Sequence, residues 1–247
     1  MLVIEAFGYR LGFEWADEGG LAAIEGVLLA DWQRTKERDA NHWFRIDNQF
    51  QLYDGAELLG RFADPEQLRL RLQQQVQMRL TAEARDYLFV HAGVVIWEQG
   101  AVVIPGPSRA GKSSLVLELV KAGASFWSDE FAVLDKEGLV HAYPRPLYQR
   151  LSKTRKQRWT PQQLGWNPGP PVPIRTLLVT RYASGACWRP RELSPDEAVE
   201  AIWKEVRYPS SRPDARKWLS RALRGAVRLS GVRGEACEIP PGLGWKV

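Results

Sequence analysis

The chain has 247 residues, of which 45% are hydrophobic and 26% charged, and it includes eleven tryptophans. This composition is typical of a folded protein and excludes an intrinsically disordered one. No run approaches the roughly 20 apolar residues that a spanning helix needs, and the first residues lack a basic signal region, so we expect a cytoplasmic protein without membrane contact. The two cysteines have no CxxC spacing and no histidine nearby, so the sequence suggests neither a zinc site nor a disulfide framework.

The net charge of +5 is concentrated in two stretches, residues 141–160 and 204–233. The first contains six basic residues and no acid, and in the second nine basic residues accompany only Glu205 and Asp214. Such stretches form either a solvated basic face or a surface that attracts phosphate or an acidic peptide. No helix-turn-helix, zinc-finger or RNP-type motif accompanies the charge, so we expect no nucleic-acid partner.

The first sixty residues favour β-structure, because residues 3–13 and 43–59 carry aromatic and branched side chains around an Asp54-Gly55 turn signal. Asp64, Pro65 and Glu66 then supply an N-cap, a first-turn proline and an early acid before an amphipathic pattern. We therefore predict a small β-rich N-terminal region with a connecting helix over residues 1–84, followed by a catalytic domain over 85–247.

The second region alternates strands and helices, which predicts an α/β sheet core. Its first two strands form a hairpin that leads into a glycine-rich loop and a helix, and Ser194 to Glu197 form a capping box that opens a later helix. The remaining expected segments are a helix near residues 212–224 and strands at 88–97, 101–104, 124–127, 176–182 paired with 186–188, and 227–229.

The loop from Gly106 to Ser113 has the sequence G-P-S-R-A-G-K-S, a P-loop (Walker A) pattern between a strand and a helix. Its backbone N–H groups surround phosphate oxygens, Lys112 neutralises the β- and γ-phosphates, and Ser113 offers its hydroxyl to Mg²⁺. The alternative is a glycine-rich turn that binds nothing. We predict ATP and Mg²⁺ as cofactors and the following ATP-binding residues: Gly106, Ser108, Arg109, Ala110, Gly111, Lys112, Ser113 and Ser114.

Asp129 and Glu130 follow a strand one helix after this loop, where carboxylates reach a phosphate-bound metal. Two adjacent acids allow two roles: one holds Mg²⁺, and the other accepts the proton of an incoming hydroxyl. The alternative is a solvated turn. His91 lies in an apolar strand, where a histidine is usually a core residue, but this strand is the hairpin partner of the one that feeds the loop. We interpret His42 and His141 as structural.

Residues 88–147 resemble the kinase domain of the HPr serine kinase/phosphorylase family, including kinases encoded beside peptide-modification genes. The resemblance rests on His91-Ala92-Gly93, the loop, Gly123, Ser128-Asp129-Glu130 and a Tyr143-Pro144-Arg145-Pro146-Leu147 segment. It implies a P-loop kinase domain with a mixed sheet and flanking helices, and a homo-oligomer.

The resemblance also implies roles for individual residues. His91 and Asp129 act at the transferred phosphoryl group and the acceptor serine, with Asp129 as the base, while Glu130 assists Ser113 in metal binding. Arg145 is a candidate phosphate clamp. The chain departs from the family at Glu130, where the bifunctional enzymes have aspartate, at Arg109, where glycine is usual, and in lacking the segment associated with phosphorylase activity.

These patterns predict an ATP-dependent serine kinase that transfers the γ-phosphoryl group to a small protein or peptide, with His91, Lys112 and Asp129 as catalytic residues. One alternative is a small-molecule kinase, acting for example on free serine. Another is a non-catalytic module that binds ATP, although such a module does not need the carboxylate pair.

Overall fold

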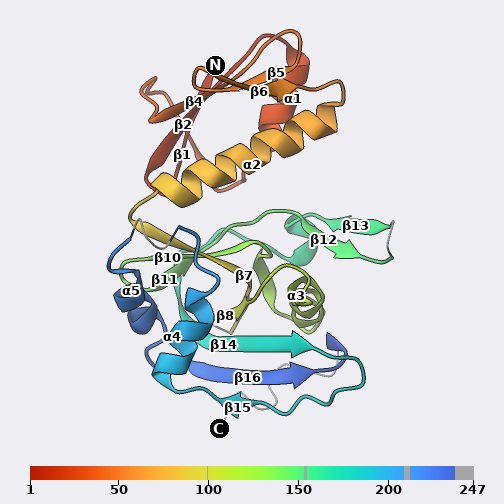
Figure 1. Ribbon diagram of the computed structural model, residues 1–247, viewed down its shortest axis with the longest axis vertical. Coiled ribbons are helices and arrows are strands. Elements are labelled where there is room, and N and C mark those ends of the chain that lie inside the picture. The colour runs from red at the N-terminus through yellow and green to blue at the C-terminus, as the bar shows by residue number, and fades with distance from the viewer. Residues whose placement is uncertain (99, 153–154, 209–211, 237–247) are drawn as a thin grey trace. The chain divides into compact units, whose positions relative to one another are not determined.

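The computed structural model describes residues 1–98, 100–152, 155–208 and 212–236 (Figure 1). The chain divides into two compact units, Met1–Asp86 and Tyr87–Val247. The sequence places the boundary between residues 84 and 85. Gln99, at the expected hairpin turn, lies outside the described residues.

The first unit is built on a six-stranded mixed sheet with the order β3-β1-β2-β4-β5-β6. Strands β2 and β4 are parallel, whereas the other neighbouring pairs are antiparallel. The predicted β-structure is confirmed, and the Asp54-Gly55 signal lies where β5 turns into β6. The strands are β1 (Leu2–Ala6), β2 (Tyr9–Trp15), β3 (Gln33–Thr35), β4 (His42–Ile46), β5 (Gln51–Asp54) and β6 (Glu57–Arg61).

Two helices belong to this unit, α1 (Glu18–Glu25) and α2 (Pro65–Glu83). The predicted start of α2 is confirmed, because the Asp64 side chain accepts a hydrogen bond from the backbone N–H of Glu66. Helix α2 turns an apolar stripe inward, with Leu68, Leu72, Val76 and Leu80 fully buried.

The second unit contains an eight-stranded mixed sheet with the order β11-β10-β7-β8-β14-β16-β15, in which β9 also pairs with β7. Strand β14 is parallel to β8 and β16, and the other described pairs are antiparallel. The strands are β7 (Tyr87–Trp97), β8 (Gly100–Pro105), β9 (Ser125–Ser128), β10 (Phe131–Asp135), β11 (Leu139–His141), β14 (Val172–Tyr182), β15 (Arg191–Glu192) and β16 (Val227–Arg233).

The predicted hairpin of β7 and β8 is confirmed, but the expected pairing of residues 176–182 with 186–188 is wrong. Both edges of β14 are already hydrogen-bonded, one to β8 and the other to β16. Residues 186–188 instead follow a turn in which Gly185 has a φ of +74°.

In the described part of this unit three α-helices flank the sheet: α3 (Lys112–Lys121), α4 (Pro195–Trp203) and α5 (Ala215–Ala222). The capping box at Ser194 and Glu197 is confirmed by both of its hydrogen bonds, and α5 is shorter than predicted. A separate antiparallel hairpin, β12 (Leu147–Arg150) with β13 (Lys156–Trp159), precedes a short 3₁₀ helix at Gln162–Leu164.

The described chain is therefore a mixed α/β structure with two mixed sheets and five α-helices. None of the helices in the described ranges has the length and hydrophobicity needed to cross a bilayer. Strand β7 lies at the centre of the second unit, and the residues singled out from the sequence lie around its middle and the adjoining start of α3.

Candidate phosphate-binding and phosphotransfer site

The glycine-rich loop, residues 106–111, joins the end of β8 to the start of α3. Gly106 and Gly111 have φ values of +154° and +83°, which side chains disfavour. Arg109 also has a positive φ, +71°, so this arginine occupies a left-handed conformation that glycine adopts at lower cost. The position at which the sequence departs from the HPr-kinase pattern thus retains a backbone geometry suited to glycine.

Helix α3 begins without a side-chain cap, because its N-cap residue is Gly111. The first amides of the helix are therefore available to an anion, and the helix dipole favours negative charge there. The buried Lys112 ammonium donates to the carbonyl oxygens of Gly106 at 2.8 Å and Pro107 at 3.0 Å. Burial lowers the pKa of Lys112, and the carboxylate of Asp129 opposes that shift. The Lys112 side chain thus folds back along the glycine-rich loop. We expect this loop to bind phosphate and Lys112 to neutralise the charge of that phosphate.

The Ser113 hydroxyl donates a 2.7 Å hydrogen bond to Oδ2 of Asp129. The other carboxylate oxygen, Oδ1, is buried without a hydrogen-bond partner among the described residues. Burial raises the pKa of Asp129 to about 6, although the Ser113 bond and the Lys112 charge lower it. One oxygen of the carboxylate is therefore hydrogen-bonded and the other is not, and burial holds the pKa of Asp129 above the usual range of an aspartate.

The Ser113 hydroxyl suits a hard cation such as Mg²⁺, which prefers hydroxyl, carboxylate and phosphate oxygens, and the negative charge of Asp129 beside it favours a cation there without Asp129 being its ligand. The orphaned Oδ1 atom supports this fit, because a cation nearby would compensate a buried negative charge that the described residues leave incompletely paired. Magnesium at phosphate sites usually takes only one or two protein ligands and completes its shell with phosphate oxygens and water.

Glu130 follows in the turn between β9 and β10, which Ser128 organises by accepting hydrogen bonds from the backbone N–H groups of Glu130 and Phe131. Burial raises the pKa of Glu130, and the positive charge of Arg145 is the largest opposing influence. Arg145 is buried, donates to the Tyr143 hydroxyl at 3.3 Å, and keeps an Nη2 atom without a partner among the described residues. The Ser113 hydroxyl therefore contacts Asp129, whereas Glu130 lies in the field of Arg145.

His91 is buried in β7, and its Nδ1 atom lies 3.5 Å from a carboxylate oxygen of Glu205. Burial, assisted by the charges of Lys112 and Arg207, lowers the pKa of His91 to about 4. The imidazole is therefore neutral at pH 7, so its contact with Glu205 is not an ion pair there. Burial also raises the pKa of Glu205.

Glu205 reaches this position because the segment after α4 pairs with β7. The backbone N–H of His91 donates to the backbone carbonyl of Glu205, and the backbone N–H of Arg207 donates to the backbone carbonyl of Phe89, both at 2.8 Å. In the sequence Glu205 stands out only as one of two acids in the basic stretch 204–233. An acidic residue within a basic stretch is the one sequence signal that could have marked Glu205 as a site residue.

Arg233, at the end of β16, was also missed as a site residue. It is almost fully buried, and its Nη2 atom donates to the Gly111 carbonyl at 2.8 Å. A side chain at position 111 would collide with this guanidinium, so glycine is required there for two reasons. Arg233 thus fixes the point at which the loop becomes α3.

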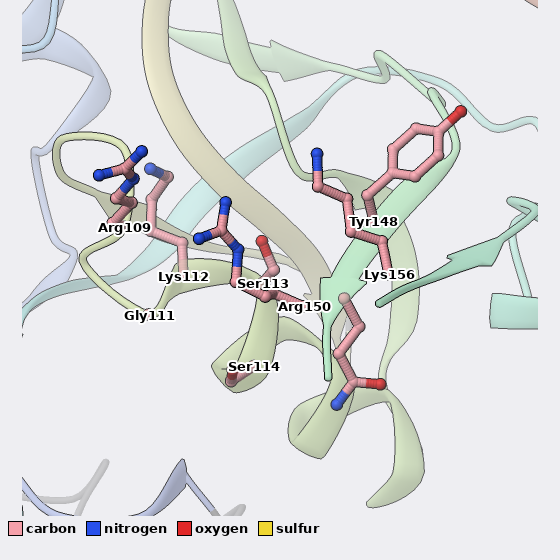
Figure 2. A pocket seen from close by; sticks show the side chains of 9 residues that line it. Arg109, Gly111, Lys112, Ser113, Ser114, Tyr148, Arg150 and Lys156 are labelled. Carbon is pink, nitrogen blue, oxygen red and sulfur yellow. The ribbon is translucent and has the colours of Figure 1, made fainter. Parts of the chain in front are cut away.

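A cavity of about 410 Å³ lies between the loop and the β12–β13 hairpin (Figure 2). This volume is within the range of small-ligand sites. The cavity is lined by two sets of residues: Arg109, Gly111, Lys112, Ser113 and Ser114 from the loop and α3, and Tyr148, Gln149, Arg150 and Lys156 from the hairpin.

The predicted residues therefore fall into two adjoining groups. Five of the predicted ATP-binding residues line the cavity, while Gly106, Ser108 and Ala110 belong to the same loop without lining it. The second group surrounds the start of α3 and consists of His91, Asp129, Glu130 and Arg145.

The two histidines interpreted as structural lie outside the site. His42 contacts Asp54 in the first unit, and His141 bonds Asp135 at 2.8 Å.

No family model matches the chain, and comparison with curated protein sequences finds no match either. The likeness to the HPr-kinase family therefore rests on the motif residues of the sequence alone.

Proposed function

We propose that the chain is an ATP- and Mg²⁺-dependent serine kinase of the HPr-kinase type, which transfers the γ-phosphoryl group of ATP to a serine hydroxyl on a small protein or peptide. The observation that carries this proposal is the hydrogen bond from Ser113 to Asp129 at the uncapped start of α3, beside the buried Lys112. It joins a phosphate-binding loop to a carboxylate that is able to accept a proton.

The loop amides and Lys112 hold the phosphates, and Ser113 presents its hydroxyl at the metal position. Bound beside Ser113, Mg²⁺ would supply positive charge that offsets the negative charge developing on the phosphates during transfer. Glu130 assists Ser113 in binding the metal, and the positive charge of nearby Arg145 partly offsets the negative charge of Glu130.

Asp129 accepts the proton of the attacking serine. As the serine oxygen bonds to the γ-phosphorus, the bond from that phosphorus to the bridging oxygen breaks and ADP leaves. A base with a pKa near 6 suits this role, because it is ionised at pH 7 yet holds a proton better than an exposed aspartate. His91 is neutral at this pH, so we assign it hydrogen bonding near the acceptor rather than charge stabilisation.

The test combines γ-labelled ATP and Mg²⁺ with serine peptides, the same peptides carrying alanine, and free serine, and locates phosphoserine by mass spectrometry. Wild type should label only serine-containing acceptors. Lys112→Ala should lose ATP binding and transfer, whereas Lys121→Ala, on the exposed end of the same helix, should retain both. Asp129→Asn should bind ATP and lose transfer.

Each contrary outcome removes a defined part of the proposal. A wild-type protein that binds no MgATP refutes the phosphate site, and transfer by Asp129→Asn refutes the assigned base. Labelling of free serine alone identifies a small-molecule kinase. Tight MgATP binding without transfer or hydrolysis identifies a nucleotide-binding module.

A further inference from the structure

The β12–β13 hairpin has one apolar and one polar face. Its register pairs Leu147 with Trp159 and Arg150 with Lys156. Leu147 is fully buried and Trp159 packs against the core, so that face is covered by the protein. The opposite face carries the exposed side chains Tyr148, Arg150, Lys156 and Arg158.

Two cations of this polar face are directed at the cavity. Arg150 and Lys156 line it together with the loop residues, and Figure 2 shows the Arg150 side chain extending from β12 toward the glycine-rich loop. Because they are a directly opposed cross-strand pair, their like charges repel and weaken the hairpin. Within the described ranges neither side chain forms an ion pair with a carboxylate.

The charge around the cavity is strongly one-sided. Arg109 and Lys112 lie on the loop side and Arg150 and Lys156 on the hairpin side, and none of the described residues that line the space between them is acidic. An anion in this space would offset repulsion between the two sides, and the benefit is largest where water is partly excluded. Phosphate is the fitting anion, because arginine binds it through paired N–H groups and lysine as a point charge.

We propose that the β12–β13 hairpin is the second wall of the phosphate site, and that Arg150 and Lys156 bind the polyphosphate tail of the nucleotide opposite the glycine-rich loop. The inference rests on the proposed function in that the loop must first hold those phosphates. It adds two binding residues and a physical reason for preferring a triphosphate to shorter phosphates, since each added phosphate supplies charge to both walls.

Calorimetric titration with MgATP, MgADP and inorganic tripolyphosphate tests the inference. Arg150→Gln and Lys156→Gln should each weaken MgATP and tripolyphosphate binding on the order of ten-fold, the usual effect of losing a charged hydrogen bond. The loss should be smaller for MgADP. Arg158→Gln is the matched control, because it removes a charge from the same exposed face without touching the cavity, and it should change these affinities less than two-fold.

The outcomes separate this inference from the proposed function. If wild type binds MgATP and both hairpin variants bind it equally well, the second wall is refuted while the phosphate site stands. If the variants raise only the KM for an acidic serine peptide, the wall belongs to the acceptor and the inference is again overturned. If wild type binds neither MgATP nor tripolyphosphate, the proposed function itself fails. A cooperative thermal unfolding transition at or above the Tm of wild type establishes that the variants fold, since each removes one partner of a repelling pair.

Discussion

Replacing Asp129 with asparagine is expected to stabilise the folded protein above pH 6 while it removes the proposed base. Burial raises the pKa of Asp129 to about 6, whereas an unfolded aspartate titrates near 3.9. The folded state therefore keeps this proton to a higher pH than the unfolded state. The contribution of Asp129 to stability falls as the pH rises from about 4 to about 6, and it stays low at higher pH.

The size of the effect follows from that difference of about two pH units, which corresponds to at most about 3 kcal/mol in the free energy of unfolding. Asparagine keeps an oxygen to accept the Ser113 hydrogen bond and cannot ionise. The free energy of unfolding of Asp129→Asn should therefore exceed that of wild type by up to about 3 kcal/mol at pH 7.5 and by almost nothing at pH 4. For a unit of this size, that is a rise in Tm of roughly 6–12 °C at pH 7.5.

Urea and thermal unfolding of both proteins between pH 4 and pH 8, without nucleotide, measure the difference. Asp135→Asn is the control, because Asp135 accepts hydrogen bonds from Leu139 and His141 and its replacement should destabilise the protein slightly. A raised pKa of Asp129 would be contradicted if Asp129→Asn were less stable than wild type at pH 7.5, or if the difference were the same at pH 4.

Two further substitutions test the packing of each unit. Gly93→Ala would place a methyl group 2.6 Å from Cγ2 of Val116. It should therefore lower the free energy of unfolding, measured in urea titrations, by about 1–3 kcal/mol. A variant as stable as wild type would show that α3 moves away freely. Asp54→Asn weakens the buried contacts with His42 and Arg79 and should lower the free energy of unfolding by about 1–3 kcal/mol. The affinity for MgATP should not change, because the proposed nucleotide site lies in the other unit. A loss of affinity in calorimetry would contradict this.

Local signals in the sequence predicted much of the fold. The N-cap at Asp64 and the capping box at Ser194 each act within a few residues, so their patterns transfer directly to the structure. The strand predicted at residues 186–188 was wrong because strand pairing depends on distant segments. Strand β14 is paired with β8 and β16, which no short-range pattern reports.

The same distinction applies to the site. The loop from Gly106 to Ser113 is contiguous, so its spacing alone predicted the cavity residues at the start of α3. Glu205 could not be predicted, because it reaches His91 through backbone pairing that follows a later helix. The hairpin cations were foreseen only as part of a basic stretch that forms either a solvated face or a surface attracting phosphate or an acidic peptide. Their direction toward the cavity is set by the register of β12 and β13.

The bond from Arg233 to the Gly111 carbonyl has a consequence for how the protein is made. Its two partners are separated by 122 residues, although they meet at a single peptide unit of the loop. During synthesis the first unit and the glycine-rich loop emerge from the ribosome long before Arg233 does. A nascent chain therefore displays its glycine-rich loop before the loop has its bond to Arg233, and the finished loop geometry is reached only after the residues that form β16 have been translated.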